Sequence, residues 1–169
     1  MSPSRPLWFF LGCAAGLVVG LNVAGIWPQV PVHAVATHAQ DNFGIATGPV
    51  DQDIEAIIFL DFLTGDLRAA VISLQTRRFA SIYEYNVIKD FPNSKNPRFL
   101  MVTGVADMRR GTLPLGQTVI YVAEVSSGQV AAYGLPWVSG QQTATGILKG
   151  RIVPLDRMKF RTAAIRNAP

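Results

Sequence analysis

The chain has few of the residues that usually carry chemistry. Its 169 residues include one cysteine and two histidines. Cys13 lies in an uncharged apolar run, so the sequence after that run has no thiol nucleophile and no disulfide. His33 and His38 both lie in a linker-like stretch, which argues against a Ser-His-Asp triad and makes a poor metal site.

Phosphate-binding loops and dinucleotide fingerprints are also missing from the sequence. We therefore predict no catalytic residue, no cofactor and no metal ligand, and an enzymatic role is not favoured. Asp51, Asp53 and Glu55 alternate and share one face of an extended chain, which could hold a Ca²⁺ ion. They lack the glycine and glutamate spacing of a calcium loop, so a solvated strand entry is the favoured interpretation.

Charge is absent from residues 7–27, LWFFLGCAAGLVVGLNVAGIW. A helix of that length spans roughly 31 Å, close to the hydrocarbon thickness of a bilayer. Trp8 and Trp27 lie near its ends, where indole rings favour the headgroup region. We expect a transmembrane anchor at 7–27, preceded by a cytoplasmic N-terminus at residues 1–6.

A cleaved secretory signal is the alternative. Arg5 supplies a basic start, and residues 34–36 and 37–39 each offer a small-residue cleavage site. No Lys or Arg follows Arg5 until Arg68, which favours an inner-membrane, single-pass protein with its C-terminal domain on the periplasmic or extracytoplasmic side. Both interpretations export the remainder of the chain.

Three glycines repeat every fourth residue within the apolar run. Gly12, Gly16 and Gly20 would form one smooth stripe on a helix, which allows a second helix to approach closely. The alternative is that glycine is simply common in membrane helices.

The rest of the chain reads as a linker at 28–53 and one exported β-domain at 54–169. Val, Ile, Phe, Tyr and Thr are frequent there in alternating runs, as in strands. The fold class we expect is all-β: mainly an antiparallel meander, in a small sandwich, a barrel or a propeller-blade-like arrangement. Three strands are predicted at 54–62, 67–73 and 79–85.

Further strands are predicted along the second half of the domain. Residues 98–106, RFLMVTGVA, are almost continuously apolar and predict a central, buried strand. A hairpin follows at 118–133, and a last pair of strands at 146–154 and 158–163. Arg109-Arg110 lies in a loop after a strand and is interpreted as a solvated corner, with an anion site as the alternative.

The two hairpins repeat one pattern. TVIYVAEVSSGQVAAY, at 118–133, aligns without a gap on AIIFLDFLTGDLRAAV, at 56–71. Gly65 matches Gly128 and should supply the positive φ that such turns need. Asp61 matches Glu124, and we expect both to accept hydrogen bonds from turn N–H groups. A glycosidase pair is the alternative use of these two carboxylates.

The sequences FLDFLTGDL and VAEVSSGQV resemble the blade repeats of quinoprotein-type β-propellers, although the tryptophan common after the glycine is absent. A second resemblance covers nearly the whole chain. PVHAVATHAQDNFGIATG, EAIIFLDFLTGDLRAAV and NPRFLMVTGVADMRR are similar to an uncharacterised membrane-anchored protein family of planctomycete bacteria. That resemblance implies an envelope protein and implies no activity.

The net charge of +4 is unevenly distributed along the chain. Residues 41–66 carry acidic side chains and no basic one, and we call them the acidic front, whereas residues 149–169 carry six basic side chains and one acidic one. We expect a contact with an anionic surface from five cations near the C-terminus: Lys149, Arg151, Arg157, Lys159 and Arg161. The alternative is that they only solvate the last strands or face the acidic front.

The predicted function is a non-enzymatic cell-envelope protein whose anchored β-domain binds or organises an envelope component. One alternative is a small carbohydrate- or cofactor-active envelope module, and another is a secreted β-domain after signal cleavage. The expected partners are the membrane and either a protein or a second copy of the chain, with no nucleic acid. Tyr83, Tyr85, Tyr121 and Tyr133 either line a binding face or finish the outer side of a sheet.

Overall fold

The computed structural model describes residues 4–26, 37–39, 41–92, 96–108, 112–140 and 146–161. The chain divides into two compact units, residues 1–33 and residues 34–169.

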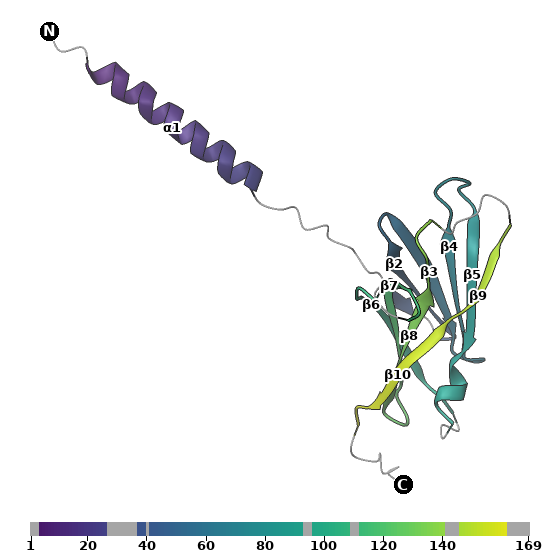
Figure 1. Ribbon diagram of the computed structural model, residues 1–169. Helices are drawn as coiled ribbons and strands as arrows, with labels where there is room; N and C mark the ends of the chain where they lie inside the picture. The colour runs from purple at the N-terminus through teal and green to yellow at the C-terminus, as the bar shows by residue number, and fades with distance from the viewer. Residues whose placement is uncertain are drawn as a thin grey trace. The chain divides into compact units, whose positions relative to one another are not determined.

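The first unit contains a single helix, α1, at Ser4–Ile26 (Figure 1). Its leucine, alanine and valine residues favour a helix or tolerate one, and no charged residue follows Arg5 within it. Nothing lies within 4 Å of a Cβ placed at Gly12, Gly16 or Gly20, so the glycine stripe is open. Within the described parts of the chain, no helix has both the length and the hydropathy that a membrane crossing requires. The predicted helix is present, and its role as a span stays a prediction.

The second unit is built from two β-sheets that share one core, which confirms the all-β expectation for this part of the chain. The larger sheet has the strand order β1-β2-β3-β4-β5-β9 and the smaller has the order β10-β8-β7-β6. The larger sheet consists of Thr37–Ala39 (β1), Phe43–Asp51 (β2), Ile54–Asp61 (β3), Asp66–Ile72 (β4), Phe79–Asn86 (β5) and Leu148–Arg151 (β9). The smaller sheet consists of Phe99–Val105 (β6), Leu115–Glu124 (β7), Gln129–Pro136 (β8) and Val153–Lys159 (β10). Neighbouring strands are antiparallel except β5 and β9, which are parallel.

Period-two alternation creates the core between the sheets. On the larger sheet, Ile58, Leu60 and Val71 have no exposed surface, while the residues between them face outward. On the smaller sheet, Ile120 and Val122 do the same. Each fully buried Ile or Leu side chain contributes roughly 1.5–3 kcal/mol to the free energy of unfolding. A disulfide-free domain is therefore held by this shared core.

The two repeated hairpins have the same turn. Gly65 has φ +69° and Gly128 has φ +68°, which confirms the positive φ expected at both. The Gly65 N–H donates to Asp61 O at 2.8 Å, and the Gly128 N–H donates to Glu124 O at 3.0 Å. The first hairpin lies in the larger sheet and the second in the smaller, so the two copies face each other across the core rather than stand side by side as propeller blades do.

The linker predicted at 28–53 is wrong for its second half, because Phe43–Asp51 forms β2 inside the larger sheet. Its glycines and its proline weaken the strand pattern in the sequence, but they serve a close approach between the sheets. A Cβ at Gly48 would lie 2.5 Å from Thr118 Oγ1, and that hydroxyl donates to Pro49 O at 2.5 Å. The β-domain therefore begins before residue 54.

The last strands also differ from the prediction. The predicted pair at 146–154 and 158–163 has other bounds in the structure, because β9 and β10 follow one another with only Ile152 between them. Ile152 is fully buried, and the chain passes there from the larger sheet, beside β5, to the smaller sheet, beside β8 (Figure 1). Residues 162–163 lie outside the described residues.

The strand predicted at 98–106 is present, but it is not central. β6 pairs with β7 and forms an edge of the smaller sheet. Its inward side chains Phe99 and Met101 are buried, whereas Leu100 and Val102 are 59% and 54% exposed. An apolar run thus marks a strand whose outward side chains are exposed and which, among the described residues, pairs with a strand on one side alone.

Candidate functional site: a basic strip beside a tyrosine–aspartate cluster

The five cations singled out in the sequence lie along the continuous segment formed by β9 and β10. We call these residues the basic strip: Lys149 and Arg151 on β9, Arg157 and Lys159 on β10, and Arg161 just after it. β9 and β10 are each an edge strand of their sheet. Four of the side chains are exposed and that of Arg161 is half-buried. Because the chain crosses between the two sheets at the buried Ile152, the two edge strands follow one another, and their charges lie along one margin of the domain.

Three arginines of the basic strip have fixed positions. The Arg151 guanidinium lies 5.2 Å from the centre of the Tyr85 ring, within cation–π range. Arg157 Nη1 donates to Asp90 O at 3.1 Å, and Arg161 Nη1 donates to Val125 O at 3.2 Å. These contacts orient the guanidinium groups without pairing them with a carboxylate. Among the residues that the structure describes, one ion pair lies within 4.0 Å, and it joins Arg68 to Glu84. No residue of the basic strip takes part in it, so the positive charge of the strip is not neutralised by an ion pair there.

A tyrosine–aspartate cluster supports the strip from inside. Tyr133 Oη donates to Asp90 Oδ2 at 2.8 Å, and Tyr85 Oη donates to Asp90 Oδ1 at 3.2 Å. The two tyrosine rings lie 5.4 Å apart. Burial, and then the neighbouring Asp90 carboxylate, raise the pKa of both phenols, so both stay protonated donors. The cluster is a support made of fully bonded groups and offers no activated nucleophile.

Asp90 belongs to the short 3₁₀-helix η1, Val87–Asp90, which follows β5. The Asn86 side chain caps this helix by accepting a hydrogen bond from the Ile88 N–H at 3.2 Å. The Val87 N–H donates to Gly65 O at 2.9 Å, so the helix rests on the first hairpin turn. Local capping and the turn glycine therefore place Asp90 beneath the strip.

A shallow hollow of about 330 Å³ adjoins the strip on the larger sheet. Arg151 lines it together with Arg68 and Lys89, and Asp66 and Glu84 contribute negative charge. It is open to solvent and carries both signs of charge. Such a surface can meet a polar group, but it does not enclose a small molecule as a catalytic pocket does.

Asp61 and Glu124 act as turn acceptors, as the favoured interpretation of the sequence has it. Asp61 Oδ1 accepts from the Leu63 and Thr64 N–H groups at 2.8 and 3.2 Å. Those hydrogen bonds lower the pKa of the Asp61 carboxyl, against a smaller opposing effect of burial.

Glu124 is bonded more completely than Asp61. It is fully buried and accepts from the Arg98, Ser126 and Ser127 N–H groups at 3.0, 2.9 and 2.6 Å. Burial raises the pKa of the Glu124 carboxyl, but the hydrogen bonds from Ser127, Arg98 and Ser126 outweigh it and lower that pKa to about 2. A carboxylate held ionised in this way does not serve as a general acid near neutral pH.

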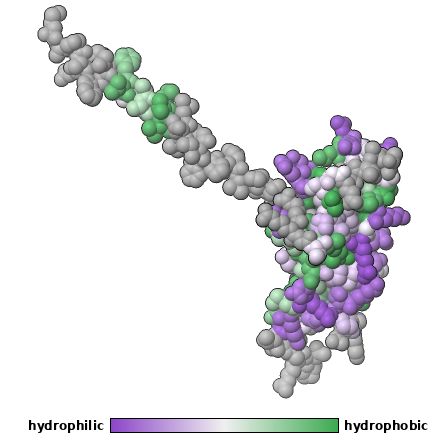
Figure 2. Space-filling view, in the orientation of Figure 1, coloured by the Kyte–Doolittle hydropathy of each residue, from purple (hydrophilic) through white to green (hydrophobic). Residues whose placement is uncertain are grey.

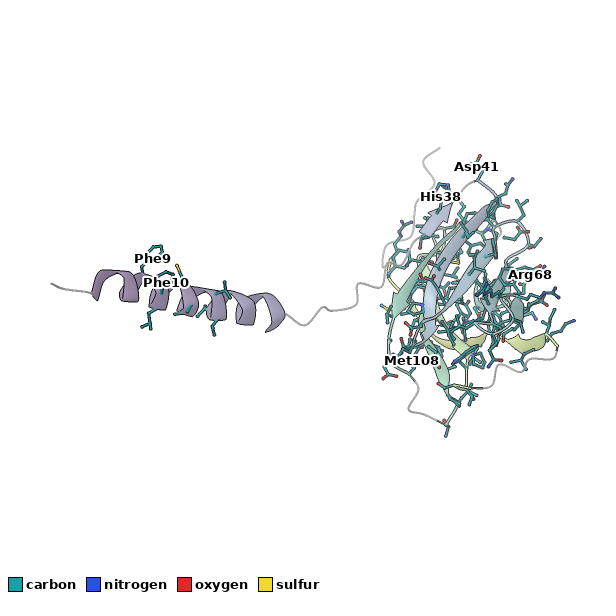
Figure 3. All side chains as sticks on the ribbon, turned by 90° about the horizontal axis from the view of Figure 1, so that it is seen from above. Phe9, Phe10, His38, Asp41, Arg68 and Met108 are labelled. Carbon is teal, nitrogen blue, oxygen red and sulfur yellow. The ribbon has the colours of Figure 1, made fainter. Side chains whose placement is uncertain are left out.

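The remaining candidates are dispersed. Asp51 Oδ2 accepts from Trp137 Nε1 at 3.1 Å and from Ser139 Oγ at 2.5 Å, a structural contact. Among the described residues, no group of three or more His, Cys, Asp or Glu could hold a metal ion. His38 lies in β1, and Figure 3 shows it with Asp41 at one margin of the domain, apart from Arg68. His33 and Arg109-Arg110 lie outside the described residues.

The four tyrosines do not form one binding face. Tyr83 and Tyr133 are core residues, with 2% and 0% of their surface exposed. Tyr85 is half-buried, and Tyr121 is exposed on the outer face of the smaller sheet. Tyr85 and Tyr133 stand out in the sequence, but their shared acceptor does not, because Asp90 begins a predicted surface loop of turn-forming residues, DFPNSKNP.

No known protein family, curated protein or solved structure matches this chain. The interpretation of the site therefore depends on its geometry and charge.

Proposed function

We propose that this protein is a non-enzymatic cell-envelope protein whose exported β-domain contacts an anionic envelope component through the basic strip. The observation that carries the proposal is the alignment of Lys149, Arg151, Arg157 and Lys159 on two consecutive edge strands, where they are exposed and have no carboxylate within 4.0 Å among the described residues. Asp156 is the one acid between the first and last of them. A row of cations of this kind is attracted to a surface of phosphate or carboxylate groups.

The support beneath the strip favours binding over simple solvation. Freely solvated arginines sample many rotamers, and fixing such a side chain in a complex costs roughly 0.5–1.5 kcal/mol. Arg151 is held over Tyr85, and Arg157 is held on Asp90 O. These two side chains are therefore already restricted in the free protein, and binding should cost less side-chain entropy.

The location of the domain is part of the proposal. The uncharged N-terminal segment directs the β-domain out of the cytoplasm, either as an uncleaved anchor or as a removed signal. An anchor would hold the basic strip close to the bilayer, where a weak electrostatic contact gains from high effective concentration. The resemblance to a planctomycete envelope family supports the same location.

Catalysis is the less favoured alternative. The only acids that the sequence suggested for a glycosidase pair, Asp61 and Glu124, both accept hydrogen bonds from turn N–H groups, and they lie in different sheets. The hollow beside Arg151 is open and shallow. Neither feature offers the convergent free groups of an active site.

The test is retention on lipid vesicles. Residues 34–169 form a compact unit with its own core, so this part can be studied alone. We expect it to sediment with vesicles rich in anionic lipid at low salt and to be released near 0.5 M salt. Arg157→Gln with Lys159→Gln should weaken retention, whereas Arg77→Gln with Arg78→Gln, which removes the same charge from an exposed turn, should not. Equal retention of the parent and both variants would reject the proposal.

A further inference from the structure

The edge strand β6 lacks three devices with which natural sheet edges prevent further pairing: charge, proline and a bulge. Its seven residues, FLMVTGV, include no charged residue and no proline, and they form no bulge with β7. Natural proteins normally guard such edges with charge, proline, a bulge or a cover, because an open ladder recruits another strand. Short β1, by contrast, has only three residues. β6 is therefore the edge at which we expect a partner.

Some backbone N–H and C=O groups of β6 are free to bond to a partner strand, as the hydrogen bonds at its two ends show. Arg98 O accepts from the Val125 N–H at 2.8 Å, and the Ala106 N–H donates to Gln117 O at 2.8 Å. Hydrogen-bonded residues alternate along an antiparallel ladder, so even-numbered residues of β6 bond to β7. The N–H and C=O groups of Met101 and Thr103 consequently point to the open edge.

The outer face beside this edge is apolar. Leu100 and Val102 are 59% and 54% exposed on β6, and Tyr121 beside Val102 on β7 is 40% exposed. Across β8, the row of Leu100 ends at Met158 on β10, which is 62% exposed, and the row of Val102 ends at Asp156. Figure 2 shows hydrophobic and hydrophilic residues interspersed on the visible face of the β-domain. The exposed apolar side chains that adjoin the edge of β6 are therefore a local group, and such a group favours an interaction at that edge.

We propose that β6 pairs with β6 of a second copy of this chain, antiparallel and with the two-fold axis at Val102. In that register Met101 faces Thr103 of the second copy, which joins the free backbone groups of both edges. Leu100 faces Gly104 of the second copy, where it meets the Tyr121 ring, because a Cβ at Gly104 would already lie 3.2 Å from that ring. The two four-stranded sheets become one continuous sheet of two chains.

The chemistry of the surface favours a second copy over a charged partner. An uncharged strand meets itself without repulsion, and a two-fold contact needs a patch that complements itself. In this register each copy places Leu100 against Gly104 and the Tyr121 ring of the other, so the contact is the same in both directions. The basic strip follows other edge strands, β9 and β10, so the dimer leaves it accessible.

Cysteine cross-linking tests the register directly. Facing residues of a non-hydrogen-bonded antiparallel pair have Cα atoms about 4.5 Å apart, within the range of a disulfide. In the full chain with Cys13→Ser, Val102→Cys should oxidise to a disulfide-linked dimer. Leu100→Cys is the matched control: it is equally exposed on the same face, yet its copy would lie four residues along the strand and out of reach.

Solution size provides the second measurement. Val102→Glu places two carboxylates at the axis and should convert the dimer of residues 34–169 into a monomer in sedimentation equilibrium. Met158→Glu, exposed on the same sheet but distant from β6, should leave the dimer intact. Far-UV circular dichroism confirms that each variant is folded. Cross-linking of Leu100→Cys as efficient as that of Val102→Cys, or a parent that is monomeric at about 100 μM, would overturn the inference.

Discussion

Tyr133 and Asp90 join the smaller sheet to the 3₁₀-helix beneath the basic strip, with Tyr133 Oη donating to Asp90 Oδ2 at 2.8 Å. Tyr133 has no exposed surface, so removal of Asp90 takes away the acceptor of a buried hydroxyl. We expect Asp90→Ala to lower the free energy of unfolding by roughly 1–3 kcal/mol, the cost of an unsatisfied buried donor. Urea denaturation of residues 34–169 measures this loss.

Tyr121→Phe is the matched control for that cluster. Tyr121 is 40% exposed, so its hydroxyl can bond to water and its removal should change stability by less than about 0.5 kcal/mol. Similar stability of the Asp90→Ala variant and the parent would show that the two tyrosine hydroxyls have other acceptors.

The turn glycines should resist substitution. Valine at Gly65 or Gly128 would have to adopt φ near +69° or +68°, where a β-branched residue is strained. Its Cβ would also meet Ile88 or Arg161. We expect each variant to lose roughly 1–3 kcal/mol in thermal or urea unfolding.

Asparagine separates the two causes, because it tolerates positive φ while still adding a Cβ. Gly65→Asn should lose less stability than Gly65→Val. If both substitutions cost the same, contact with Ile88 rather than backbone conformation sets the requirement for glycine.

Glu124 should give the domain a pH-dependent stability. The folded-state pKa of Glu124 is about 2, below the ordinary value of 4.5. The stabilisation is therefore fully present above pH 4.5 and is lost as the pH falls toward 2. Glu124→Gln should cost roughly 1.5–3 kcal/mol at neutral pH, the worth of hydrogen bonds to a charged group.

The same variant should flatten the stability profile between pH 4.5 and pH 2. Glu55→Gln, at an exposed position on β3, should leave both the stability and the profile unchanged. A parent profile that the Glu124→Gln substitution does not alter would contradict the assigned hydrogen bonds.

A separate prediction concerns whether the N-terminal segment is retained in the mature protein. If residues 7–27 stay in the mature protein, the full chain should remain in the membrane fraction after washing with alkaline carbonate. Its N-terminus, determined by mass spectrometry, should be the encoded one. A released species that begins at Thr37 or Gln40 would identify a cleaved signal instead.

Local patterns predicted the parts of the fold that depend on neighbouring residues. The strands β3, β4 and β5 follow from alternation and turn residues, and the hairpin glycines follow from the repeated Thr/Ser-Gly turn. β2 was missed because Gly48 and Pro49 weaken its pattern, although the close contact with Thr118 requires a small residue there. Only the three-dimensional fold brings that partner close.

Distant partners also explain what was missed at the site. The sequence located the five cations of the basic strip, but their alignment depends on Ile152, where the chain crosses between sheets to reach β8. The bond from Tyr133 to Asp90 joins residues far apart in the chain, and no local pattern marks it. Likewise, β6 reads as central from its apolar run, while its neighbours in the fold leave it at an edge.

The affinity of residues 34–169 for anionic vesicles tests the proposed function most directly. Each cation near an anionic surface contributes about 1 kcal/mol. Arg157→Gln with Lys159→Gln should therefore raise the dissociation constant about 30-fold at low salt. Arg77→Gln with Arg78→Gln should leave it within about twofold of the parent value. Dissociation constants that rise equally in both variants, or in neither, would contradict a contact made by the basic strip.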